Sequence, residues 1–233
     1  NILNNIKLVI KKKMFSNKYG TRIWQIIRAV SLLRVSSFRK IFLEAKKGDV
    51  CLDIGANIGH ASLVLWLKGV KEIHSFEPNP YAFASLKKNI STIKNIKIYK
   101  VAVSSKIAKE KLYLHKKVDY MQDDNSRVIY SQASSLFSEK INLGKTFCEV
   151  DSINLVQFIE EKKLFPNLLK CDIEGGEYLI YDQLLMLAEL NSLRRLFVEC
   201  HANKAQIFKK KHNNFVNLVH ESRNLNKFEL NWH

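Results

Sequence analysis

Long hydrophobic runs, clustered cysteines and acidic residues are all scarce in this sequence. No apolar run approaches the roughly 20 residues that a membrane-spanning helix needs, and the run beside the first glycine loop extends only from Leu63 to Leu67. The first residues lack the succession of charge, apolar segment and small-residue cleavage site that marks a signal peptide. We therefore expect a cytoplasmic protein.

The cysteines show no metal-binding or disulfide pattern. None of the 4 cysteines stands in a CxxC pair, and each lies in an apolar segment that reads as a strand. Metal sites and disulfides draw on clustered cysteines in loops, so these residues are expected to be small buried hydrophobic groups. Reduced thiols again fit the cytoplasm. The positions are Cys51, Cys148, Cys171 and Cys200.

Acidic residues are outnumbered by basic ones. The 233 residues carry 38 Lys and Arg against 22 Asp and Glu, a net charge of +16. Such a charge suits nucleic acid or an anionic membrane. However, 30 of the basic residues are lysine, asparagine is also abundant, and the 8 arginines, the better phosphate readers, are scattered. We favour a lysine-rich solvated surface without a nucleic-acid partner, and peripheral membrane contact stays open.

Residues 1–45 differ from the rest of the chain. They are basic and have apolar residues at helical spacing, which predicts a helical extension packed against the main domain. A basic amphipathic helix that touches a membrane or covers a ligand site is the alternative. We expect residues 46–233 to form the main domain. The apolar stripe comprises Ile23, Ile26, Ile27, Val30, Leu32 and Leu33.

From Asp49 onward, strand-like and helix-like segments alternate. Such alternation predicts an α/β fold, a mostly parallel Rossmann-like sheet with helices on both faces. Residues 104–145 are polar and irregular around a strand-like segment at 111–115, which predicts a small β-hairpin insertion. Expected strands cover residues 50–54, 70–76, 96–103, 146–150, 168–173, 193–200 and 227–232, and expected helices cover 58–68, 80–90, 153–163 and 178–190, with a further polar helix before the last strand.

The loop in VCLDIGANIGH, residues 50–60, suits a ligand without phosphate. It lacks both the middle glycine of a dinucleotide-binding turn and the Gly-Lys-Ser/Thr of a P-loop. The carboxylate of Asp53 just before the turn would repel phosphate and favour a cation. S-adenosylmethionine combines a sulfonium with an ammonium, and Glu77, 22 residues after Gly55, stands close to the spacing of about 20 expected for a ribose-binding carboxylate.

Several motifs in this order resemble the FkbM family of S-adenosylmethionine-dependent methyltransferases. They are DIGANIGHAS (53–62), FEPNP (76–80), VAVS (101–104), SSL (134–136) and KCDIEGGE (170–177). The resemblance implies the class I methyltransferase fold and methylation of a hydroxyl on a sugar or sugar-bearing small molecule. It also implies cofactor contacts along these motifs, at Asp53, Gly55, Asn57, Gly59, Glu77, Pro78, Asn79, Ala102 and Asp172.

Titratable residues follow two expected strands. In open α/β sheets, ligands bind at the carboxyl ends of the strands, so Asp172, Glu199 and His201 are expected beside the methyl group as catalytic candidates. His201 would remove the proton of a hydroxyl acceptor, or Asp172 would do so or orient the cofactor or the substrate. We expect the acceptor to contact Glu174, Ser134 and Ser135 as well.

Residues and motifs that the sequence lacks argue against a metal site and limit the class of methyl acceptor. Asp172, Glu174 and His201 could hold Mg²⁺, but this set is incomplete and we expect no metal. The chain has neither a Pro-Cys pair nor an Asp/Asn-Pro-Pro-aromatic segment, which argues against methylation of nucleic-acid bases. Methylation of a glycan or small-molecule hydroxyl is preferred. The alternatives are RNA 2′-hydroxyl methylation and a non-catalytic basic module that binds a membrane or nucleic acid.

Overall fold

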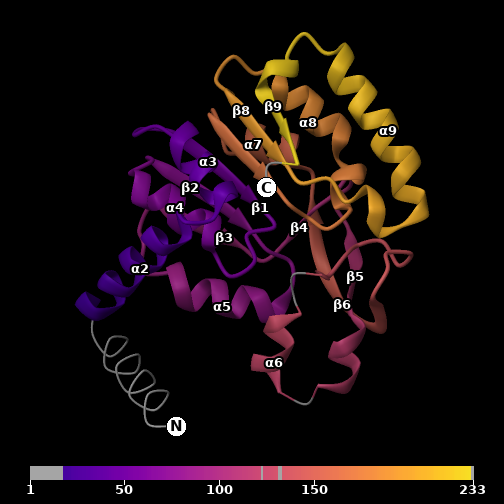
Figure 1. The fold of residues 1–233 in the computed structure, drawn as a ribbon, viewed down its shortest axis with the longest axis horizontal. Coiled ribbons are helices and arrows are strands. Elements are labelled where there is room, and N and C mark those ends of the chain that lie inside the picture. Colours follow the sequence, from indigo (N-terminus) through magenta and orange to yellow (C-terminus); the bar gives the residue numbers. More distant parts are fainter. Residues whose placement is uncertain (1–17, 122, 131–132, 232–233) are drawn as a thin grey trace.

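A six-stranded sheet forms the centre of the molecule (Figure 1). The computed structural model describes residues 18–121, 123–130 and 133–231. All neighbouring strands of this sheet run parallel, which confirms the expected α/β class. In spatial order the strands are β3 (Ile96–Tyr99), β2 (Glu72–Phe76), β1 (Val50–Ile54), β7 (Leu168–Cys171), β8 (Arg195–Val198) and β9 (Phe228–Leu230).

Helices cover both faces of the sheet because successive strand residues point to opposite sides. Cys51 belongs to the core under the first group of helices, and its neighbour Leu52 to the core under the second. The first group is α2 (Lys18–Leu32), α3 (Ser36–Glu44), α4 (His60–Lys68) and α5 (Pro80–Ile90). The second group, on the right in Figure 1, is α7 (Leu155–Glu161), α8 (Tyr181–Ala188) and α9 (Gln206–Glu221).

A smaller sheet extends the molecule beside α5 and α6 (Figure 1). Its strands are β4 (Ala102–Val103), β6 (Leu143–Ile153) and β5 (Lys109–His115), in that order, and β5 and β6 form the expected antiparallel pair. The predicted single strand 96–103 is wrong, because the chain leaves the main sheet after Tyr99 and Ala102 pairs with Ser152 of β6. The short helices are η1 (Lys116–Tyr120), α6 (Asp124–Ile129), η3 (Gly176–Leu179), η4 (Ala202–Lys204) and η5 (Leu225–Lys227).

The N-terminal helices pack against the main domain, but through a different face from the one expected. Ile23, Ile27 and Val30 are each more than half exposed, at 52%, 58% and 52%. The buried residues of α2 are Gln25, Ala29 and Leu32, of which only Leu32 belongs to the predicted stripe. The amide of Gln25 donates to the carbonyl oxygen of Asn89 at 2.8 Å, which ties α2 to α5, and a polar anchor of this kind does not follow the apolar pattern.

The part of the expected extension at residues 1–17 lies outside the described residues. Within the described part of the chain, no helix is both long enough and apolar enough to cross a membrane.

Candidate functional site

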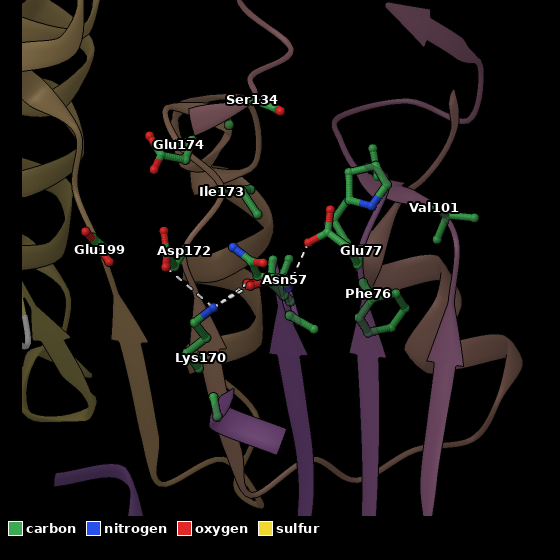
Figure 2. A pocket seen from close by; sticks show the side chains of 18 of the residues that line it. Asn57, Phe76, Glu77, Val101, Ser134, Lys170, Asp172, Ile173, Glu174 and Glu199 are labelled. Carbon is green, nitrogen blue, oxygen red and sulfur yellow. Dashed lines mark hydrogen bonds and ion pairs between the residues drawn. The ribbon is translucent and has the colours of Figure 1, made fainter. Parts of the chain in front are cut away.

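A cavity of about 380 Å³ lies at the carboxyl ends of β1, β2, β7 and β8, where the sequence predicted a site (Figure 2). Its volume falls within the range of about 300–1,000 Å³ found for small-molecule pockets. Of the expected site residues, nine line it: Gly55, Asn57, Glu77, Pro78, Ala102, Ser134, Asp172, Glu174 and Glu199. The other five do not: Asp53, Gly59, Asn79, Ser135 and His201.

The two glycines of the loop solve different packing problems. Gly55 has a φ of +73°, and a Cβ there would lie 1.8 Å from the carbonyl oxygen of Asp172. Only glycine therefore allows the loop to approach the end of β7. Gly59, with a φ of +94°, precedes α4 and packs against Leu86 of α5, where a Cβ would lie 2.9 Å from that side chain. Gly59 therefore contacts α5 and does not line the cavity.

Asp53 does not offer its charge to a ligand as expected. It is fully buried, and its Oδ2 accepts a hydrogen bond from Ser62 Oγ at 2.6 Å. Its Oδ1 lies 3.4 Å from the ammonium of Lys170, which also donates to the carbonyl oxygen of Gly55 at 2.6 Å. The charge of Asp53 is therefore neutralised within the protein, and Asp53 supports the loop from below.

Lys170 is a functional-site residue that the sequence analysis missed. It is buried and lines the cavity, and its ammonium lies 3.7 Å from Asp172 Oδ2 (Figure 2). Burial alone would lower the pKa of Lys170, but the carboxylates of Asp172 and Asp53 outweigh burial and raise that pKa. The sequence feature that could have revealed Lys170 is its place inside the apolar strand LLKC, since a lysine buried in a strand needs a charged partner.

Glu77 ends β2 at the place expected for a ribose-binding carboxylate. It is buried, and its two oxygens accept backbone hydrogen bonds from Asn57 and Asn79, both at 2.8 Å. Burial raises the pKa of Glu77 to about 7, although the two backbone donors oppose the shift. The side chain of Asn79 points elsewhere, because it caps α5 by accepting from Tyr81 N–H and donates to Ser134 Oγ.

Asn57 presents an unused acceptor to the cavity. It occupies the left-handed region with a φ of +51°. Its Oδ1 is buried and has no hydrogen-bond partner among the described residues. A buried acceptor without a donor costs about 1–3 kcal/mol, so this atom favours a ligand that carries an N–H or O–H group.

Asp172, Glu199 and His201 come together although β7 and β8 end before them. His201 Nε2 lies 3.9 Å from Asp172 Oδ1 and 3.6 Å from Glu199 Oε1. Its Nδ1 donates to Glu177 Oε1 at 3.0 Å. Burial alone would lower the pKa of His201, but Glu177, with Glu174 and Asp172, raises it to about 9. This raised pKa favours a protonated His201 at neutral pH and argues against the expected role of His201 as the base.

Of the three residues expected to contact the acceptor, two line the cavity and one does not. Glu174 lines the cavity with a carboxylate that receives a hydrogen bond from the buried Lys140 at 2.5 Å. Ser134 also lines the cavity. Ser135 is buried and donates to the carbonyl oxygen of Glu174 at 2.9 Å, so it holds the loop rather than a substrate.

The N-terminal helices contribute a wall of the cavity, which agrees with the alternative that residues 1–45 cover a ligand site. Phe38 of α3 lines the cavity and meets the ring of His60 edge to face, with centroids 5.9 Å apart. Arg28 of α2 donates to His60 Nε2 at 2.7 Å. Burial, with Arg28 and Lys170, lowers the pKa of His60 to about 4, so its imidazole is neutral.

A parallel α/β sheet with a cavity at its carboxyl edge and a carboxylate at the end of the second strand defines a Rossmann-like protein. Within this class, the family model described as "Methyltransferase FkbM domain" matches residues 53–226 of the chain. The chain belongs to this methyltransferase family, which confirms the resemblance found in the sequence. No curated protein matches the chain.

Two of the solved structures that resemble this chain are described as a methyltransferase and a putative methylase. The methyltransferase FkbM of Methylobacillus flagellatus KT is 11% identical with a TM-score of 0.44, and the match covers 81% of this chain and 54% of that protein. A putative rRNA-methylase of Clostridium thermocellum is 13% identical with a TM-score of 0.41, covering 78% of this chain and 76% of the other. These scores are low, so the family assignment rests on the family model. The chain spans about half of the Methylobacillus protein.

Proposed function

We propose that the chain transfers a methyl group from S-adenosylmethionine to a hydroxyl of a sugar or sugar-bearing small molecule. The observation that carries the proposal is the cavity itself. Glu77, after β2, lines one end of the cavity and would bind a ribose. Asp172 and Glu199, after the neighbouring strands β7 and β8, line the other end (Figure 2).

The cavity wall fits a cationic nucleoside. Four carboxyl side chains line it, from Glu77, Asp172, Glu174 and Glu199, against the ammonium of Lys170. This excess of carboxylates disfavours phosphate and favours the sulfonium and ammonium of S-adenosylmethionine. The oxygens of Glu77 keep lone pairs for two ribose hydroxyls, and Oδ1 of Asn57 can accept from the ammonium.

The same residues support transfer to an oxygen. When bound, S-adenosylmethionine supplies an electrophilic methyl group, and holding the acceptor in line with it can lower the barrier by roughly 7–11 kcal/mol. Asp172 is 31% exposed and can meet an incoming hydroxyl. Its carboxylate, or that of Glu199, can accept the hydroxyl proton, which adds about 10²–10⁴-fold. His201 and Lys170 hold Asp172 between them.

The acceptor end favours a sugar over RNA. Asp172, Glu174 and Glu199 line this end of the cavity. An RNA 2′-hydroxyl is flanked by phosphates, and carboxylates at the site of transfer would repel them. A neutral sugar meets no such repulsion, because its hydroxyls donate hydrogen bonds to carboxylates.

Cofactor binding can be tested by thermal unfolding with S-adenosylhomocysteine. We expect the product to raise the melting temperature of the wild type and of Glu149→Gln, a change at an exposed residue away from the cavity. Glu77→Gln should lose most of the rise. A wild type without any shift would contradict the proposal.

The acceptor class can be tested with methyl-labelled S-adenosylmethionine and fractionated cell extract. We expect label in a glycan or nucleotide-sugar fraction with the wild type and little with Asp172→Asn. Label that appears in RNA instead would refute the sugar proposal and favour the RNA alternative.

A further inference from the structure

Asp172, Glu199 and His201 form a cluster of mixed donor type at the acceptor end of the cavity. Each offers one ligand atom, and these atoms all lie within 4.8 Å of one another. The carboxylates lie at the ends of two adjacent strands, β7 and β8, and both line the cavity. Figure 2 shows Asp172 and Glu199 turned toward the same space between these strands. In the set considered from the sequence, Glu199 takes the place of Glu174.

The imidazole of His201 is held as metal-ligating histidines are held. The ring is 5% exposed, and its Nδ1 donates to Glu177, which is fully buried. Glu177 Oε1 also accepts the backbone N–H of His201 at 2.8 Å, and its Oε2 accepts the N–H of Gly175 at 2.8 Å. Ligating histidines almost always donate their second ring nitrogen to a carboxylate in this way, which fixes the tautomer and the ring orientation.

The other ring nitrogen is aimed at the cluster. Among the described residues, His201 Nε2 makes no hydrogen bond, and the carboxylate oxygens of Asp172, Glu174 and Glu199 face it at 3.6–3.9 Å. Glu174 already receives a hydrogen bond from Lys140. A divalent cation placed in the cluster would interact with Nε2 and with the carboxylates of Asp172 and Glu199 together.

We propose that Asp172, Glu199 and His201 bind a divalent first-row transition cation. One imidazole nitrogen and two carboxylate oxygens suit ions from Mn²⁺ to Zn²⁺, and three protein ligands leave a position open for a further ligand. Tetrahedral ligands about 2.1 Å from an ion lie about 3.4 Å apart. The 3.6 and 3.9 Å from His201 Nε2 exceed this spacing by a few tenths of an ångström. The ligand oxygens of Asp172 and Glu199 lie within 4.8 Å of each other, so binding needs these two side chains to approach by at most about 1.4 Å. The ion replaces the proton on His201 Nε2.

The open position would face the acceptor. A hydroxyl oxygen held there would be oriented toward the methyl donor, and the cation would stabilise the negative charge that develops on it. Its proton would pass to the carboxylate oxygen of Asp172 or Glu199 that does not ligate the cation, because each residue offers only one ligand atom. This role rests on the proposed methyl transfer. The binding site itself does not, because its three ligands belong to the protein.

The test is titration of the protein with Mn²⁺ alone, followed by the electron paramagnetic resonance signal of free Mn²⁺. The wild type should remove about one equivalent from the free signal, and Zn²⁺, which binds such sites more tightly, should restore it. Glu199→Gln should bind at least tenfold more weakly. Glu177→Gln keeps all three ligands and should bind about 10–100-fold more weakly, as for other carboxylates behind a ligating histidine. Glu149→Gln serves as the control and should match the wild type.

A free Mn²⁺ signal that the wild type leaves unchanged would overturn the proposal, and so would Glu199→Gln that binds as tightly as the wild type. Thermal unfolding of each variant shows that it is folded, so a loss of binding reports on the site. No methyl donor is present, and the S-adenosylhomocysteine shift is measured separately. Product binding without Mn²⁺ binding refutes only the metal site, whereas Mn²⁺ binding without product binding refutes only the methyltransferase proposal.

Discussion

Removing the ammonium of Lys170 should destabilise the protein strongly. Lys170→Met keeps the length and apolar stem of the side chain but leaves Asp53 as a buried carboxylate with Ser62 as its hydrogen-bond donor. Asp53 is fully buried, whereas Asp172, the second carboxylate near Lys170, is 31% exposed and keeps contact with water. The loss therefore arises mainly at Asp53.

The magnitude follows from the burial of this pair. Breaking a buried ion pair by removing one partner costs about 3–5 kcal/mol. In a chain of this size, 1 kcal/mol corresponds to about 2–4 °C in melting temperature, so a decrease of about 6–20 °C is expected. The carbonyl of Gly55 also loses its donor, which places the expected loss toward the upper part of this range.

Urea unfolding of Lys170→Met, Asp53→Asn, the double variant and a control would test the reasoning. Lys209→Met, at an exposed position of α9, is the matched control and should change the free energy of unfolding by less than about 0.5 kcal/mol. Adding Asp53→Asn to Lys170→Met should recover part of the loss, because no buried charge is then left. A loss below about 1 kcal/mol for Lys170→Met would refute the argument. Fully additive losses in the double variant would refute it as well.

Three further results are expected. Because the pKa of Glu77 is raised to about 7, the ionised fraction of Glu77 decreases from pH 8 to pH 6. Calorimetry should therefore show the affinity for S-adenosylhomocysteine falling about tenfold over this range. Glu77→Gln should show no such fall, and the same change of affinity with pH in both proteins would contradict this reasoning. Gly55→Ala should lower the free energy of unfolding in urea by about 2–4 kcal/mol. Gly48→Ala, also at positive φ but with no atom within 4 Å of an added Cβ, should lower it by only about 1–2 kcal/mol. Equal losses in the two variants would exclude the predicted clash at Gly55. Phe38→Ala should weaken product binding about 2–10-fold, and Phe42→Ala, on the same helix outside the cavity, should leave it unchanged. Wild-type affinity in Phe38→Ala would exclude a part for Phe38 in binding.

Elements with strong local signals were predicted well. The helix at Pro80–Ile90 was predicted with its observed bounds, because Asn79 supplies a side-chain cap and Pro80 suits the first turn. The placement of Asp172 and Glu199 on neighbouring strands was also confirmed, since the order β1-β7-β8 follows from the expected parallel topology. The packed face of α2 was predicted wrongly, because Gln25 is buried by hydrogen bonds across 64 and 67 positions of sequence.

The sequence by itself determined the α/β class, the family, the glycine loop and nine of the residues that line the cavity. These follow from hydrophobic period, turn residues and motif spacing, which are properties of short windows of chain. Tertiary structure decided which charges meet. Lys170 neutralises Asp53, and Glu177 holds His201, across 117 and 24 positions of sequence. Such pairings depend on the distance and the dielectric between side chains on different strands, and therefore only the folded sheet shows that Asp172, Glu199 and His201 come within 4.8 Å of one another.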